Sequence, residues 1–239
     1  ELPLDLNGDP IELTTGTRYR GVEGYEVDAW YMREWAGVNP DNGDPLWYMD
    51  DGNGGRTTTN TWNEADPYYQ GANAQPNQFG GINTRVNVFG FYAQANLSFS
   101  FDYKIYDNWA FYMKSDGRVA GAFGQYATAT DYWTPENTDA ANPKPILFGN
   151  NNAYNTSSRY LYDGDHVRLK SLNVGYNIPP RYLENIGLKS ASVYFTGRNL
   201  WTHMFDEDLK WDPEQKADGF TDLSAQPMRT LTFGVKANF

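Results

Sequence analysis

The sequence predicts an all-β protein, more specifically an antiparallel transmembrane β-barrel with long extracellular loops. Apolar and polar residues alternate with a period of two over unusually long stretches. The chain is polar on average, with a mean hydropathy of -0.70, yet 16% of its residues are aromatic. Strands that are apolar on one face and polar on the other have this composition. The connections between the predicted strands also alternate between short and long.

The clearest strand is predicted over Val88–Tyr103. Its odd-numbered positions hold Phe89, Phe91, Ala93, Ala95, Leu97, Phe99, Phe101 and Tyr103, and its even-numbered positions are mostly polar. A barrel strand of about 9–11 residues crosses a bilayer, and this stretch is longer. We expect Phe89, Phe91, Leu97 and Phe99 to face lipid, and Gln94, Asn96 and Ser98 to face the lumen.

Further strands are predicted wherever the alternation returns. The stronger ones are Val167–Ile178, Ala191–Arg198 and Thr230–Phe239, and the weaker ones are Gly24–Trp35 and Asp66–Ala72. The phase of Val167–Ile178 slips near Ser171-Leu172, and a β-bulge would explain the slip.

The predicted connections differ in length. Asn73–Asn87 and Pro179–Lys189 are short and contain turn residues, whereas Lys104–His166 and Thr202–Met228 are long. Outer-membrane barrels have short periplasmic turns and long outer loops. We therefore expect Val38–Tyr69, Lys104–Asp165 and Thr202–Pro227 to be extracellular. A soluble β-sandwich that binds or adheres to a partner is the alternative, because its strands also alternate.

Composition argues against several classes of function. A net charge of -11 and a pI near 4.6 disfavour nucleic-acid binding, which needs clustered Lys and Arg. The only histidines, His166 and His203, belong to no recognisable catalytic motif, so no enzyme and no cofactor is predicted. Asp5–Asp9 is interpreted as an Asn-Gly turn rather than a calcium loop. The acidic residues between Asp206 and Glu214 are interpreted as loop charge, so no metal site is predicted.

Several motifs together resemble one family. Asp163–Pro179 (DGDHVRLKSLNVGYNIP) resembles the "dGsylRLknltlgYnlP" run of SusC/RagA-like TonB-linked outer-membrane proteins. The other matching segments are Trp35–Gly43, Trp133–Asn137, Thr196–Trp201, Asp212-Pro213-Glu214 and Arg229–Phe239, which follow the family's order. His166 departs from the family, which usually has an aromatic residue or Leu at this position.

The resemblance implies that residues 1–239 are the carboxy-terminal part of a TonB-dependent receptor β-barrel, with the plug domain absent from this chain. The roughly six predicted strands cannot close a plugged barrel of about 22 strands. The chain is then either a fragment of a longer polypeptide or one piece of a split barrel.

The family's function supplies further expectations. The resemblance implies a transporter in the bacterial cell outer membrane that imports large nutrients, most often oligosaccharides and sometimes peptides. It also implies a SusD-like surface lipoprotein as partner and contact with the TonB complex through the missing amino-terminal part, in addition to membrane lipid around the barrel.

Aromatic residues in the polar segments between strands are candidates for ligand contact. An aromatic ring covers the apolar face of a sugar, while neighbouring amides and carboxylates bind its hydroxyl groups. The predicted ligand-binding residues are Trp47, Trp62, Trp133 and Tyr160. The alternatives for each ring are a membrane-interface belt, loop packing and contact with a partner protein.

Overall fold

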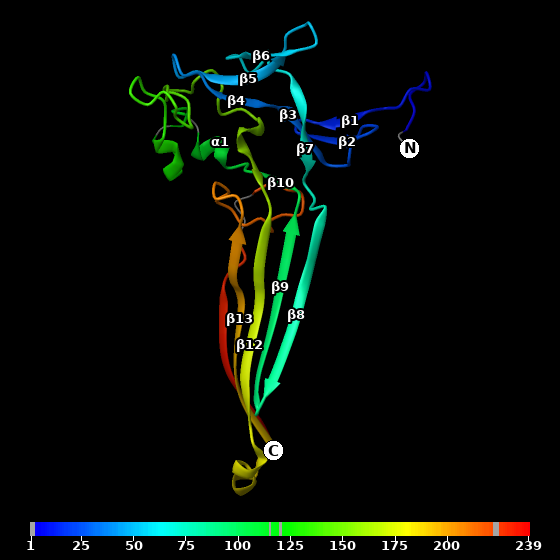
Figure 1. The fold of residues 1–239 in the computed structure, drawn as a ribbon, viewed down its shortest axis with the longest axis vertical. Helices are drawn as coiled ribbons and strands as arrows, with labels where there is room; N and C mark the ends of the chain where they lie inside the picture. Colours follow the sequence, from blue (N-terminus) through cyan, green and yellow to red (C-terminus); the bar gives the residue numbers. More distant parts are fainter. Residues whose placement is uncertain (1–2, 115, 120, 222–224) are drawn as a thin grey trace. The chain divides into compact units, whose positions relative to one another are not determined.

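The computed structural model describes residues 3–114, 116–119, 121–221 and 225–239, and divides the chain into two compact units (Figure 1). Unit 1 comprises residues 1–75, 104–162 and 216–223, and unit 2 comprises residues 76–103, 163–215 and 224–239. Among the described residues, no helix is both long enough and apolar enough to cross a membrane.

Unit 2 is built on a five-stranded antiparallel sheet, with strand order β14-β13-β12-β9-β8. The strands are β8 (Gln78–Val88), β9 (Phe91–Phe101), β12 (His166–Ile178), β13 (Ser190–Met204) and β14 (Thr230–Asn238). Figure 1 shows them as the long neighbouring arrows of the sheet. The four stronger predicted strands all lie here, so this part of the prediction is confirmed.

The register of this sheet separates apolar from polar residues. One row of directly opposite residues runs across all five strands and is entirely apolar, namely Val86, Ala93, Val174, Phe195 and Phe233. The adjacent row is entirely polar, namely Arg85, Gln94, Asn173, Thr196 and Thr232. Successive residues of a strand point to opposite faces. The sheet therefore has one apolar face, on which Phe233 is 80% exposed, and one polar face.

The predicted bulge in β12 is present. The pairing of β12 shifts between Leu169 and Ser171 against both of its neighbours, directly beside the predicted slip. Strand β13 is longer than Ala191–Arg198 because it pairs with β12 again beyond an irregular step, where Asn199 has a φ of 50°.

The predicted connection Asn73–Asn87 is wrong, because most of it is β8. Gly80 lies within this strand directly opposite Phe99, and a Cβ at Gly80 would lie 2.7 Å from Phe99 Cζ. Glycine here leaves room for the neighbouring ring. The true turn is Phe89-Gly90, with φ of 48° and 89° as in a type I′ hairpin. Phe89 therefore belongs to the turn and not to the lipid-facing positions of the strand.

The alternation of connection lengths is retained with this change. The turn Phe89-Gly90 and the connection Pro179–Lys189 lie at one end of the sheet, and the connections that follow Phe101 and Met204 lie at the other. The connection Pro179–Lys189 contains two 3₁₀ turns, η3 (Pro180–Tyr182) and η4 (Glu184–Ile186).

Unit 1 contains shorter strands in separate sheets. One sheet has the order β1-β2-β3-β7, another has the order β4-β5-β6, and β10 pairs with β11. The bounds are β1 (Leu13–Thr15), β2 (Arg18–Gly21), β3 (Ala29–Arg33), β4 (Trp35–Val38), β5 (Pro45–Asp50), β6 (Arg56–Thr59), β7 (Pro67–Asn73), β10 (Lys104–Tyr106) and β11 (Leu161–Asp163). The helical turns are α1 (Ala110–Met113), η1 (Ala127–Thr130) and η2 (Ser158–Tyr160).

The two weaker predictions had different outcomes. Asp66–Ala72 matches β7, whereas only half of Gly24–Trp35 is strand, namely β3 and the first residue of β4.

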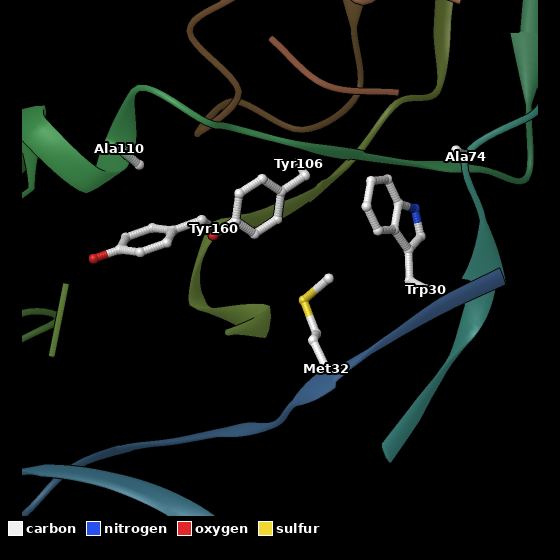
Figure 2. Close-up of a cluster of buried hydrophobic side chains, with 6 residues drawn as sticks. All are labelled: Trp30, Met32, Ala74, Tyr106, Ala110 and Tyr160. Atoms are coloured by element: carbon white, nitrogen blue, oxygen red, sulfur yellow. The ribbon is translucent and has the colours of Figure 1, made fainter. Parts of the chain in front are cut away.

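The core of unit 1 consists largely of aromatic rings from distant parts of the chain. Figure 2 shows Trp30, Met32, Ala74, Tyr106, Ala110 and Tyr160 gathered in one buried cluster. The indole N–H of Trp30 donates to the carbonyl of Lys104 at 2.9 Å, so its polar atom has a partner. The segments 1–75 and 104–162 thus fold as one body around shared side chains.

Candidate functional site

The four predicted ligand-binding residues have different surroundings in unit 1. Trp47 and Tyr160 are fully buried, Trp133 is 9% exposed and Trp62 is half-buried. The ring of Tyr160 lies in the core cluster beside Tyr106 (Figure 2). Neither Trp47 nor Tyr160 exposes a ring face for a ligand in this structure. The structure does not bring the four residues together in one site.

Trp133 is held by a distant turn of the chain. Its indole N–H donates to the carbonyl of Pro40 at 2.9 Å, and a Cβ at Gly43 would lie 2.6 Å from its ring. The segment resembling the family's "WtpeNp" motif therefore packs on the segment resembling "yaGvdpetG". Loop packing accounts for the contacts of this ring.

Trp62 lines a cavity of about 380 Å³. The residues around this cavity are Thr14, Gly16, Tyr31, Met32, Arg33, Trp62, Pro67, Phe111, Asn155 and Thr156. The indole N–H of Trp62 donates to the carbonyl of Thr156 at 3.1 Å, which fixes the ring in the wall. The cavity thus has the size of a small-molecule site. It is surrounded by three aromatic rings, a thioether, an amide and one guanidinium. We call this cavity the Trp62 pocket.

Arg33 is the charged residue of the Trp62 pocket, and no sequence pattern predicted it. Its Nε donates to the carbonyl of Trp62 at 2.7 Å, and its guanidinium carbon lies 3.7 Å from the centre of the Trp62 ring. Burial lowers the pKa of Arg33, and the charge of Asp66 opposes this effect. In the part of the chain that the structure describes, no carboxylate forms an ion pair with Arg33.

A second polar cluster lies on the polar face of β12 in unit 2. Arg168 Nη2 lies 2.6 Å from Asp212 Oδ1, and Arg168 Nε lies 3.1 Å from Glu214 Oε2. Lys170 Nζ is 3.1 Å from Glu214 Oε1, and His166 Nε2 is 3.6 Å from the same oxygen. We call these five residues the carboxylate clasp. The Asp212-Pro213-Glu214 motif thereby fastens the long connection after β13 to the start of β12.

The neighbours of Glu214 in the clasp lower its pKa. His166, followed by Arg168 and Lys170, lowers the pKa of Glu214 to about 2, against the opposing effect of burial. The other ring nitrogen of His166 lies 2.9 Å from the carbonyl oxygen of Gly164, to which an Nδ1–H donates, and 3.1 Å from the hydroxyl oxygen of Tyr103. Burial raises the pKa of Tyr103. Glu214 is therefore ionised at neutral pH.

Carboxylates of the acidic segments form ion pairs and accept hydrogen bonds within this chain. Asp212 and Glu214 contact cations, and Asp206 accepts a hydrogen bond from the backbone N–H of Asp163 at 3.0 Å. Asp5 accepts hydrogen bonds from the backbone of Asn7 and Asp9, which closes the predicted turn. Across residues 3–114, 116–119, 121–221 and 225–239, no group of three or more His, Cys, Asp or Glu residues could hold a metal ion.

Comparison with known proteins shows a similarity to one class of membrane receptors. No family model matches the chain. A TonB-dependent receptor of Formosa agariphila is 32% identical over 170 residues, which are 64% of this chain and 17% of that receptor. A second TonB-dependent receptor of the same organism is 34% identical over 131 residues, covering 50% of this chain and 12% of the relative. The chain is thus similar to TonB-dependent receptors over 64% of its length. These relatives are receptors rather than enzymes.

Solved structures support this assignment at the level of fold. The RagAB peptide importer in its closed-closed state matches with a TM-score of 0.75 and 20% identity, over 95% of this chain and 25% of that chain. The RagAB peptide transporter matches with a TM-score of 0.72 and 21% identity, over 88% and 23%. The sheet of unit 2 is therefore part of an antiparallel transmembrane β-barrel and not of a β-sandwich. The chain spans a quarter or less of the length of these relatives.

Proposed function

We propose that residues 1–239 form the carboxy-terminal wall and part of the outer loops of an outer-membrane transporter that imports large nutrients with energy from TonB. The separation of apolar and polar rows across the five strands carries this proposal. In a barrel, an apolar outer face contacts lipid and a polar inner face lines the lumen. The plug domain and the contact with TonB belong to a segment outside residues 1–239.

The sidedness follows from the connection lengths. Short turns of outer-membrane barrels lie in the periplasm and long loops outside. Phe89-Gly90 and Pro179–Lys189 are then periplasmic, and the long segments Val38–Tyr69, Lys104–Asp165 and Thr202–Pro227 are extracellular. Unit 1 contains most of these segments and is therefore proposed to contact the nutrient.

The proposed nutrient is an oligosaccharide, and the second candidate is a peptide. Aromatic rings beside amides and hydroxyls favour a sugar, because the rings cover C–H faces and the polar groups bind hydroxyls. The Trp62 pocket has this composition. The peptide candidate is favoured by the fold likeness to RagAB, which is described as a peptide transporter and importer. Trp62 is the predicted ligand contact whose ring lines a cavity.

The proposed partner is a SusD-like surface lipoprotein that docks on the extracellular loops. This partner is implied by the family resemblance, and loops longer than about 12–15 residues usually bind something or are disordered. Affinity purification of the full-length parent from outer membranes is expected to recover a lipoprotein. Recovery of the parent alone under mild detergent would remove the partner from the proposal.

Uptake in cells tests the transport function. Cells that express the full-length parent are expected to take up labelled oligosaccharide, and deletion of the TonB gene should abolish this uptake while surface levels of the parent stay normal. Uptake that continues without TonB would indicate a passive porin instead. Recovery of the parent in the soluble fraction without detergent would contradict the membrane barrel.

A further inference from the structure

Among the described residues, half-buried Arg33 of unit 1 forms no ion pair with a carboxylate. Arg159 is paired with Asp116, and Arg18 lies 3.7 Å from Asp28. More exposed Arg56 lies 2.8 Å from Glu34. Within the described residues, Arg33 makes its hydrogen bond through Nε and forms no ion pair, so its terminal amino groups remain available. The charge of Asp66 acts on Arg33 without an ion pair between them, so a half-buried cation is only partly compensated. A bound anion would compensate it further.

The walls of the Trp62 pocket are otherwise uncharged. Arg33 is the charged residue among those that line the pocket, in a chain whose net charge is -11. Tyr31, Trp62 and Phe111 supply aromatic surface, and Asn155 supplies an amide. The field inside the pocket therefore favours a negatively charged group.

The guanidinium is held in position before any ligand arrives. Trp62 is fixed by its hydrogen bond to Thr156, and Arg33 is stacked on Trp62 and bonded to its carbonyl. A planar guanidinium binds a carboxylate through two parallel hydrogen bonds, and fixing its plane beforehand reduces the entropy lost on binding. The free amino groups of Arg33 form such a fork beside aromatic walls.

We propose that the Trp62 pocket binds an acidic sugar unit, with Arg33 holding the carboxylate and the aromatic walls covering the sugar ring. This inference rests on the proposed function, because it names the substrate class that the transporter would import. The volume of about 380 Å³ suits a compact ring better than an extended chain. Peptides are usually recognised in grooves or along strand edges, so an acidic peptide is the less suitable ligand.

Binding to matched probes tests the proposal. Full-length parent is purified in detergent, and its affinity is measured by calorimetry for short oligomers of galacturonate and of glucuronate. The control ligands are the same oligomers with their carboxyl groups reduced to alcohols, and a glutamate-rich peptide. We expect at least one acid oligomer to bind at least tenfold more tightly than its reduced form and than the peptide. Equal affinity for acid and reduced forms, tighter binding of the peptide, or no binding of either acid oligomer would overturn the proposal.

Variants connect this binding to Arg33. Arg33→Gln is expected to weaken binding of the acid oligomer at least tenfold while leaving the reduced form unaffected, and Arg33→Lys should retain part of the preference. The matched control is Arg56→Gln, which removes another stacked arginine of unit 1 outside the pocket and should leave affinity unchanged. Heat-modified mobility on gels verifies that each barrel has folded. Unchanged affinity in folded Arg33→Gln would refute the role of Arg33.

The uptake experiment separates this inference from the proposed function. Uptake of a neutral oligosaccharide that depends on TonB, together with no preference for acid probes, would preserve the transporter and reject the acidic-sugar pocket. Loss of TonB dependence together with tight binding of acid probes would preserve the acidic-sugar pocket and reject the transporter.

Discussion

At the scale of single residues, tyrosine and glycine alternate across the polar face of the sheet. Tyr92, Gly175, Tyr194 and Gly234 lie directly opposite one another on β9, β12, β13 and β14. A Cβ at Gly175 would overlap the ring of Tyr92, and one at Gly234 would overlap the ring of Tyr194. Each ring occupies the space that a side chain on the neighbouring strand would need. Such pairs stabilise the sheet at positions where glycine alone would weaken it.

Gly175→Ala should therefore destabilise the barrel by about 1–3 kcal/mol, since the new methyl group forces the ring of Tyr92 away. The unfolding of the full-length parent in detergent, followed against urea, measures the loss. The control is the same substitution in a Tyr92→Ala background, where the space is empty and Gly175→Ala should cost much less. An equal cost in both backgrounds would show that the ring is not the cause.

The carboxylate clasp makes a prediction about pH. The pKa of Glu214 is lowered from its ordinary value of 4.5 to about 2, so its contribution to stability is fully present above pH 4.5 and is lost as the pH falls towards 2. Glu214→Gln should be less stable than the wild type at pH 7, by about 1–3 kcal/mol given the partial exposure of the group. The difference in unfolding free energy should shrink from pH 4.5 downwards.

Glu207→Gln is the control for this measurement, because Glu207 is an exposed carboxylate of the same connection outside the clasp. Its unfolding free energy should follow that of the wild type at every pH. A difference between wild type and Glu214→Gln that stays constant down to pH 2 would contradict the lowered pKa.

At the scale of elements, regular alternation was enough to predict the sheet of unit 2 but not all its strands. Strand β9 was predicted because its odd-numbered positions are apolar and its even-numbered positions are mostly polar. Strand β8 was missed because Gly80-Gly81 is also a turn signal. Position 80 is a glycine because the ring of Phe99, on the neighbouring strand, occupies the space that a side chain would need. The sequence does not reveal this pairing. Strands of three or four residues in unit 1 are too short to show a period.

The candidate site was predictable to a smaller extent. An aromatic residue in a polar segment has the same local sequence whether its ring is buried or open. Trp133 is buried by Gly43 and Pro40, about which its own neighbours say nothing. Arg33 ends an ordinary strand, and its stacking on Trp62 depends on a contact across 29 positions. Composition therefore identified the kind of surface but not the residues that form a pocket.

The two faces of β9 can be tested with a pair of neighbouring substitutions. Leu97 lies opposite Ile82 and Leu169 on the apolar face, and Asn96 lies opposite Asn83 and Ser171 on the polar face. Leu97→Arg should cost roughly 2–4 kcal/mol if the residue lies at mid-bilayer, whereas Asn96→Arg should cost much less. Folding of the full-length parent into lipid vesicles measures both. Equal costs would count against a lipid-facing apolar surface.

At the scale of the whole molecule, the proposed sidedness can be mapped on intact cells. Residues 1–239 contain no cysteine, so single cysteines introduced there are specific labels once any cysteine elsewhere in the parent is replaced. Cysteines at Asn60, Asn151 and Lys216 in the full-length parent should react with an impermeant reagent, because these positions belong to the proposed extracellular segments. A cysteine at Asn185, in the connection between β12 and β13, should be protected. Reaction at Asn185 alone would reverse the proposed topology.

The strand order of unit 2 has a consequence for handling this chain by itself. In the described residues, the outer sides of β8 and β14 carry no neighbouring strand. Backbone N–H and C=O groups that are left unpaired in hydrocarbon cost several kcal/mol each, so a sheet with open margins is not stable in a bilayer. In water, unpaired edge strands instead pair with edge strands of other copies of the chain, which leads to aggregation. The 239-residue chain expressed alone should therefore collect in inclusion bodies, and strands supplied by the rest of the receptor should be needed to keep it in a membrane.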